Sequence, residues 1–154
     1  MDIVDAKMIE LLMHNSRISG AEIARKVHLS LPAVTERLRK LNESGAIKHY
    51  SIKLSGSYFG WDLKAFIKVW VNHGLAEGIV QEVTACAPVL ECHHIAGDYD
   101  LLLKVMVKDT KELEEFLTKQ LKVIKGVSRT STTIVLDTYL EKINRNPKDG
   151  SSVS

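Results

Sequence analysis

Residues 30–40 (SLPAVTERLRK) bring together the side-chain types that contact DNA. Four apolar residues recur at helical spacing from this stretch to the residue after it, Leu31, Val34, Leu38 and Leu41, which predicts a helix with one buried face. The other faces carry small, hydroxylic or charged side chains, which suit base edges and phosphates. We predict DNA contacts from Ser30, Pro32, Ala33, Thr35, Glu36, Arg37, Arg39 and Lys40. An ordinary solvated helix has a similar composition, so the neighbouring elements must decide between the two interpretations.

The turn Gly97-Asp98-Tyr99-Asp100 is the second place where chemistry is expected. Backbone N–H groups at a glycine turn can bind a carboxylate, while Asp98 or Asp100 can pair with an ammonium group. A free amino acid carries both charges, so all four residues are candidate contacts for a small effector. The alternative is that these residues only build the turn.

The run Glu91-Cys92-His93-His94 contains residue types that bind metals. Adjacent residues on a strand point to opposite faces, so at most Cys92 and His94 act together. Two ligands from one chain are too few for a metal site without help from another subunit. We therefore predict no metal site, and we also predict no cofactor and no catalytic residues. Cys86 and Cys92 form neither a CxxC pair nor a disulfide framework, which predicts reduced thiols.

A helix-turn-helix is predicted because two capped helices are separated by only two residues. Ser19 and Glu22 have the spacing of a capping box, and Ser30 is a second N-cap. The first helix is predicted to end near Val27, which leaves residues 28–29 as the turn. A doubly capped helix pair with so short a turn favours the DNA-binding interpretation of residues 30–40.

Two further segments complete an expected DNA-binding domain of residues 1–54. Residues 3–15 carry a helical apolar stripe and predict a third helix that packs across the pair. Gly45 can supply the left-handed residue that closes the second helix of the pair. Beyond it, residues 46–54 (AIKHYSIKL) have apolar points among polar residues, which predicts a short β-ribbon. A winged helix-turn-helix is therefore expected.

A Ser/Gly-rich interval at residues 55–60 (SGSYFG) predicts a linker, after which the periodicity changes. Apolar alternation and helix caps then predict the order β-α-β-β-α-β, a ferredoxin-like sandwich in an α+β chain. The predicted strands are 63–71, 89–96, 101–107 and 127–136, and the first predicted helix is 76–86. The second predicted helix is capped by Asp109 or Thr110, has an apolar stripe that extends to Leu121, and is broken by Gly126. Residues 61–143 are expected to bind the effector and to form oligomers. Residues 144–154 are polar and are expected to be disordered.

Both faces of the predicted sheet carry apolar side chains, although two helices can cover only one face. The second face includes Phe66, Trp70, Leu102 and Met106. Such a face needs a cover, and the same face of another copy is the simplest one. We therefore predict a two-fold dimer, which would present two helix-turn-helix modules to a palindromic site.

Composition sets the compartment and the electrostatic contribution to binding. The 154 residues are 45% hydrophobic, enough for one ordinary domain or two small ones. The absence of a bilayer-spanning apolar run or a secretory signal in the sequence predicts a cytoplasmic protein with no membrane partner. Residues 1–60 carry nine Lys and Arg against six Asp and Glu, a net charge of +3, and residues 61–154 carry −1. This mild basic excess predicts weak non-specific DNA affinity and several DNA-binding modules acting together.

Over residues 1–143 the chain resembles the Lrp/AsnC (feast/famine) family of transcription regulators. The C-terminal half is similar to the family pattern at residues 97–100 (GDYD). The similar N-terminal positions are Asp5, Ile9, Asn15, Arg17, Ala24, Leu29, Ser30, Val34, Arg37, Leu38, Leu41, Gly45 and Ile47. The resemblance implies a DNA-binding dimer, often assembled to octamers, and a small effector, usually an amino acid, bound near the GDYD turn.

Two stretches, residues 91–94 and 131–133, depart from the family pattern, so the resemblance does not select an effector. An alternative class is the haem-biosynthetic sirohaem decarboxylases, which share the two-domain layout and contain histidines. Against that class, the GDYD turn is regulator-like, and the sequence shows no convergent cluster of basic residues for a polycarboxylated tetrapyrrole. The sequence therefore favours a regulator over an enzyme.

Overall fold

The chain forms two compact units, residues 1–53 with 140–154 and residues 54–139. The structure is a computed structural model that describes residues 2–72 and 77–147. Each unit has its own hydrophobic core. Of the tail predicted to be disordered, residues 144–147 belong to the first unit, and the remainder lies outside the described residues.

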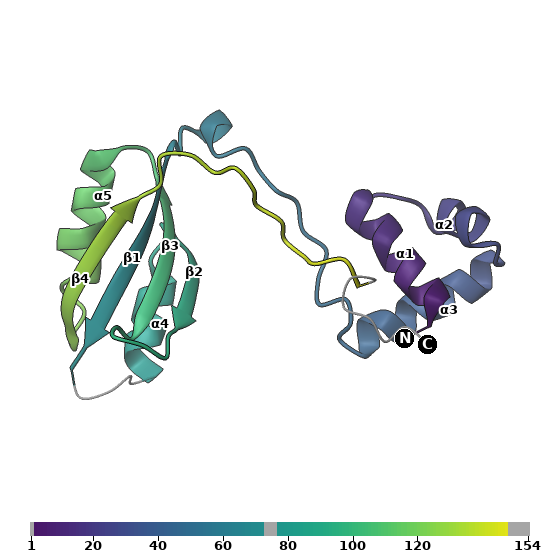
Figure 1. Cartoon of the computed structure of the whole chain (residues 1–154), viewed down its shortest axis with the longest axis horizontal. Helices are drawn as coiled ribbons and strands as arrows, with labels where there is room; N and C mark the ends of the chain where they lie inside the picture. The colour runs from purple at the N-terminus through teal and green to yellow at the C-terminus, as the bar shows by residue number, and fades with distance from the viewer. Residues whose placement is uncertain (1, 73–76, 148–154) are drawn as a thin grey trace. The chain divides into compact units, whose positions relative to one another are not determined.

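Three helices form the first unit, α1 (Ile3–His14), α2 (Gly20–Val27) and α3 (Leu31–Glu43) (Figure 1). The Ser19 hydroxyl accepts a hydrogen bond from the Glu22 N–H at 3.1 Å, and the Ser30 hydroxyl accepts one from the Ala33 N–H at 3.4 Å. These bonds satisfy N–H groups that a helix start leaves unpaired. His28 closes α2 with a left-handed φ of 57°, which reverses the chain within a short turn. The predicted helix-turn-helix is confirmed.

The core of this unit lies where the three helices meet. Its buried side chains are Met8, Ile23, Ala24, Val27 and Val34. Leu31, which helical spacing placed in the core, is 49% exposed, so that prediction is wrong. Leu31 is the first residue of α3, and its side chain lies against Gly20, where an added Cβ would come within 3.1 Å.

The predicted wing is not formed, because residues 46–54 contain no strand. A two-stranded ribbon needs a turn between its strands, and this segment contains no glycine, proline, asparagine or aspartate to make one. Its apolar side chains remain exposed, with Tyr50 at 52% and Ile52 at 78%. All of the segment except Leu54 belongs to the first unit, and the segment extends no sheet.

The second unit is a four-stranded antiparallel sheet in the order β2-β3-β1-β4. Its strands are β1 (Leu63–Val71), β2 (Val89–His94), β3 (Leu101–Val107) and β4 (Val127–Ile134). Its helices are α4 (Glu77–Ala85) and α5 (Thr110–Phe116), which continues as a π-helix, η2 (Leu117–Leu121). This is the predicted ferredoxin-like arrangement, with β2 and β4 each two residues shorter than expected. Residue 76, the predicted start of α4, lies outside the described residues.

Alternate residues of the strands pack against α4, α5 and η2 and form the larger core (Figure 1). From the sheet these are Ala65, Ile67, Val69, Leu101, Leu103, Val105 and Val107, and from the helices Ile79, Val83, Leu113, Phe116 and Leu121. Because strand side chains alternate, the intervening residues form the opposite surface, which we call the outer face.

The Ser/Gly-rich interval belongs to the second unit. Ser57–Phe59 forms a short 3-10 helix, η1. A Cβ at Gly56 would lie 2.8 Å from the Trp61 carbonyl oxygen and 2.9 Å from the Met106 sulfur. Only glycine allows this close approach, so the segment is packed near Met106.

Candidate functional site

The exposed side of α3 carries most of the side chains that were predicted to contact DNA. Pro32, Thr35, Glu36, Arg39 and Lys40 are exposed, and Ala33 and Arg37 are half-buried. The Ser30 side chain caps the helix, so it lies at the N-terminal end of this surface. The helix thus presents small residues at one end and charged residues further along, as the prediction required.

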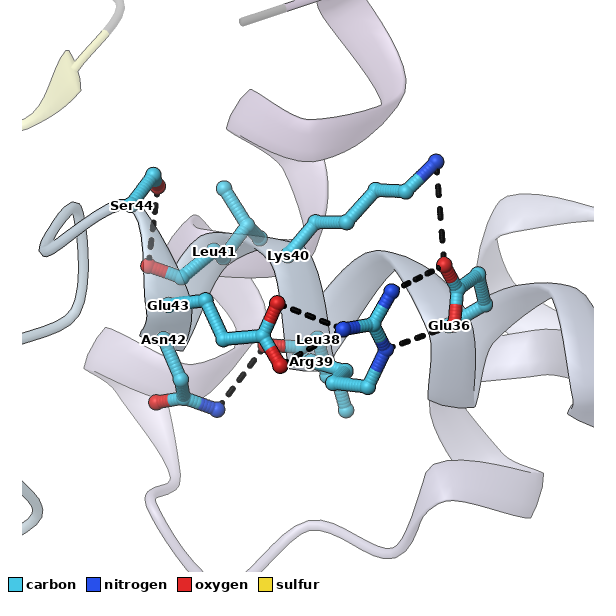
Figure 2. A network of polar contacts seen from close by, with 8 residues as sticks. All are labelled: Glu36, Leu38, Arg39, Lys40, Leu41, Asn42, Glu43 and Ser44. Carbon is cyan, nitrogen blue, oxygen red and sulfur yellow. Dashed lines mark hydrogen bonds and ion pairs between the residues drawn. The ribbon is translucent and has the colours of Figure 1, made fainter.

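Arg39 is held between two carboxylates of its own helix (Figure 2). Its Nε lies 2.8 Å from Glu36, one helical turn before it, and its other contact is Glu43, one turn after it. Lys40 lies 3.7 Å from the same Glu36 carboxylate. The hydrogen bond from Arg39, with the charges of Arg39 and Lys40, lowers the pKa of Glu36 to about 2. A DNA phosphate or guanine must therefore compete with Glu36 and Glu43 for these cations.

Arg37 has a structural role that its sequence position does not reveal. Its Nη1 lies 2.6 Å from the Asp2 carboxylate and 2.8 Å from the Asp5 carboxylate. Asp2 and Asp5 together form the capping box of α1, so Arg37 ties α3 to the start of α1. The hydrogen bond from the Asp5 N–H, and next the bond from Arg37, hold the pKa of Asp2 below its usual value. Helical spacing placed Arg37 on the flank of α3 but could not identify partners more than thirty residues earlier.

Replacing Arg37 with alanine is expected to lower the melting temperature at pH 7, because Asp2 and Asp5 lose their shared cation. The folded pKa of Asp2 lies below the usual 3.8. The stabilisation is therefore present above that value and is lost as the pH falls through the folded pKa. Thermal melts of the Arg37→Ala variant and the wild type should converge at low pH. Arg25→Ala, at an exposed arginine of α2, is the control, and equal loss in both variants would contradict the assignment.

The predicted effector residues lie together in residues 95–100, the bend between β2 and β3. The Asp100 carboxylate accepts a hydrogen bond from the Val71 N–H at 2.8 Å, and its own N–H donates to the Val69 carbonyl at 2.9 Å. Asp100 therefore fixes the turn to the end of β1. Gly97 and Asp98 are exposed, and Tyr99 is half-buried.

Tyr99 extends the turn toward side chains of the outer face. Its ring lies edge-on to Trp70, with centroids 5.9 Å apart, and the Lys68 Nζ lies 5.0 Å from its centre. Trp70 also contacts a cation, because the Arg129 guanidinium lies 4.4 Å from the centre of the Trp70 ring. We call Lys68, Tyr99, Trp70 and Arg129 the aromatic–cation cluster. The alternation of β1 placed Lys68 and Trp70 on one face, but only the strand register adds Arg129.

The residues considered for a metal site separate between the two faces of β2. Cys92 lies opposite Leu103 and packs against the core, whereas Glu91 and His93 lie on the outer face. There Glu91 contacts His93 at 3.1 Å and Lys104 at 3.0 Å. Among the described residues, no three histidine, cysteine or acidic side chains are grouped to hold a metal ion.

No helix within residues 2–72 and 77–147 is long and apolar enough to cross a membrane.

Comparison with known proteins matches both units to family models. Residues 1–42 match the AsnC-type helix-turn-helix domain, and residues 64–144 match the Lrp/AsnC ligand binding domain. The chain is 33% identical over 141 residues to the HTH-type transcriptional regulator FL11 of Pyrococcus horikoshii, covering 92% of this chain and 93% of that protein. It is 31% identical over 140 residues to the leucine-responsive regulatory protein of Escherichia coli, covering 89% and 85%.

Solved structures give the same result. The E. coli AsnC structure superposes with a TM-score of 0.87 at 25% identity, covering 96% of this chain and 99% of that one. The complex of the regulator NMB0573 from Neisseria meningitidis with L-methionine gives 0.85 at 26% identity, covering 93% and 94%. Both matched domains occur here in the same order and over nearly the whole length. The chain therefore belongs to the Lrp/AsnC family of transcriptional regulators.

Proposed function

We propose that this regulator binds specific double-stranded DNA sites through the exposed side of α3. The observation that carries the proposal is the helix-turn-helix itself, in which α3 is exposed along the side predicted to contact DNA. The proposed contact residues are Ser30, Pro32, Ala33, Thr35, Glu36, Arg37, Arg39 and Lys40. Among them, Arg39 and Lys40 are the exposed cations, and Arg37 acts mainly by positioning α3 against α1.

We further propose that an amino-acid effector binds at Gly97–Asp100 and changes DNA affinity through assembly. Relatives include a leucine-responsive protein and a regulator complexed with L-methionine, which supports an amino acid as the ligand class. The outer face supports a two-fold dimer, since Phe66 is 37% exposed there and the apolar Leu102 and Met106 lie diagonally beside it on β3. Further assembly, to octamers as the family resemblance implies, would bring several α3 helices to one DNA site.

A regulator that acts on the genome works in the cytoplasm and needs no catalytic residues. The sirohaem-decarboxylase alternative has one observation in its favour, which the sequence did not reveal. The outer face carries four cations, Lys64, Lys68, Lys104 and Arg129. A visible absorption titration with a polycarboxylated tetrapyrrole tests this alternative, and an unchanged spectrum would leave the regulator as the proposed function.

DNA binding is tested with a site selected from random duplexes. The double variant Arg39→Ala and Lys40→Ala should bind this site more weakly, because phosphate or guanine contacts are lost. The dependence of affinity on salt should also become shallower, by about one unit of slope for each phosphate contact removed. Fluorescence anisotropy measures both quantities. The exposed Lys7→Ala of α1 is the matched control, and an unchanged affinity in the double variant would place the DNA contact elsewhere.

A further inference from the structure

The outer face concentrates positive charge in a part of the chain that is slightly negative overall. Residues 61–154 contain twelve basic and thirteen acidic residues. The strand register nevertheless places four cations and a single carboxylate, Glu91, on the outer face. The remaining outer positions of the strands are aromatic, aliphatic, hydroxylic or histidine. The apolar residues that the sequence predicted on this face therefore lie among cations.

One of these cations, Lys68, contacts the proposed effector turn, and a second, Arg129, is linked to the turn through Trp70. Lys68 lies opposite Ser131 in the sheet, and Arg129 lies opposite Trp70, so the two cations are diagonal neighbours on adjacent strands. Tyr99 of the turn contacts both Lys68 and Trp70. Within the part of the chain that the structure describes, neither Lys68 nor Arg129 forms an ion pair with a carboxylate. Their observed contacts are with aromatic rings, which leave the positive charge uncompensated.

The turn does not supply the missing negative charge through Asp100, because that carboxylate binds the Val71 N–H. A two-fold dimer through the outer face would place this cationic surface against an identical one. Like charges brought together and removed from water oppose association unless an anion joins them. The Ser131 and Thr133 hydroxyls on the same face are additional donors for such an anion.

From this geometry we infer that the effector is a dicarboxylic amino acid. Its ammonium and α-carboxylate groups would bind at Gly97 and Asp98, and its second carboxylate would lie between Lys68 and Arg129. Binding would then neutralise the outer face and favour pairing of the sheets. This inference rests on the proposed function, because it specifies the chemical class of the effector at the turn.

The test compares acids with their neutral amides, which have nearly the same shape. Melting temperature and sedimentation of the full chain are measured with sodium L-glutamate or L-aspartate. They are measured again with L-glutamine or L-asparagine plus sodium chloride at equal ionic strength, which controls for screening. We expect the acids to raise the melting temperature and shift assembly at concentrations roughly tenfold or more below those required of the amides. Equal or stronger effects of the amides would overturn the inference.

Variants locate the second carboxylate. Lys68→Met and Arg129→Met keep much of the side-chain volume but remove the charge, so each should abolish the preference for acids over amides. Lys122→Met, at an exposed lysine outside the sheet, is the matched control and should keep that preference. An unchanged glutamate response in both outer-face variants would overturn the inference.

The same experiments separate this inference from the proposed function. The absence of a response to any of the four probes, in a protein that still binds its selected DNA site, would overturn only the dicarboxylic class. A spectral change with the tetrapyrrole, together with no response to amino acids, would show that the outer-face cations bind a different anion. This result would also overturn the inference of a dicarboxylic amino acid. Failure to bind any specific DNA would instead refute the proposed function.

Discussion

Replacement of Phe66 by lysine is expected to yield monomers and to weaken operator binding by roughly a hundredfold or more, because the two DNA-binding modules would no longer be joined. Phe66 lies in the middle of β1 on the outer face and is 37% exposed. Lysine removes an apolar contact and adds a positive charge to an already cationic surface. Glutamate would be a poorer probe, because it would pair with the lysines of a second copy.

Sedimentation velocity measures the mass of the Phe66→Lys variant, and anisotropy measures its operator affinity. Val123→Lys is the control, since Val123 is a 66% exposed apolar residue outside the sheet. The wild type and the control should share the larger mass. A dimeric Phe66→Lys variant with full affinity would show that another surface joins the subunits. Met106, an equally plausible target from sequence, is less suitable because Gly56 packs against its side chain.

Replacement of Asp100 by alanine should lower the free energy of unfolding of the second unit by about 1–3 kcal/mol, because the Val71 N–H loses its acceptor. The turn would then be held to β1 by the backbone bond from residue 100 to the Val69 carbonyl without the carboxylate bond, and the effector response should fall. Chemical denaturation measures the stability, and effector titration by thermal shift measures the response.

Two matched variants divide structural from ligand-binding roles at this turn. Asp100→Asn keeps an acceptor oxygen for the Val71 N–H, so it should retain most of the stability. Asp98→Ala should leave the stability unchanged and reduce the effector response, because the exposed Asp98 is the carboxylate proposed to meet the ammonium group. If Asp98→Ala responds as the wild type does, the turn has only a structural role.

The architecture was accessible from sequence because local signals agreed with one another. Serine caps and helical spacing identified α2 and α3 nearly to the residue. Alternation identified β1, and the apolar run that follows the turn at residues 97–100 identified β3. The predicted wing was wrong because a few apolar residues in a polar segment do not define a strand without a turn and a partner strand. The predicted burial of Leu31 was wrong because helical spacing does not show where a helix begins relative to the core.

The candidate site was only partly accessible, since its side chains are joined by contacts distant in sequence. Arg37 meets Asp2 and Asp5 only after α1 and α3 have packed, and this changes its expected role. Similarly, Arg129 reaches Trp70 only when β4 pairs beside β1. Residue type alone suggested that Asp100 binds a ligand, whereas the fold employs its carboxylate at the end of β1.

The path of the chain between the two units has a mechanical consequence. The second unit is inserted within the first, so the polypeptide crosses between them twice, near residues 53 and 140. Beside these crossings Lys53 and Glu141 form an ion pair at 2.7 Å. Cleavage of the chain at either crossing would therefore leave the two units joined by one covalent connection instead of two.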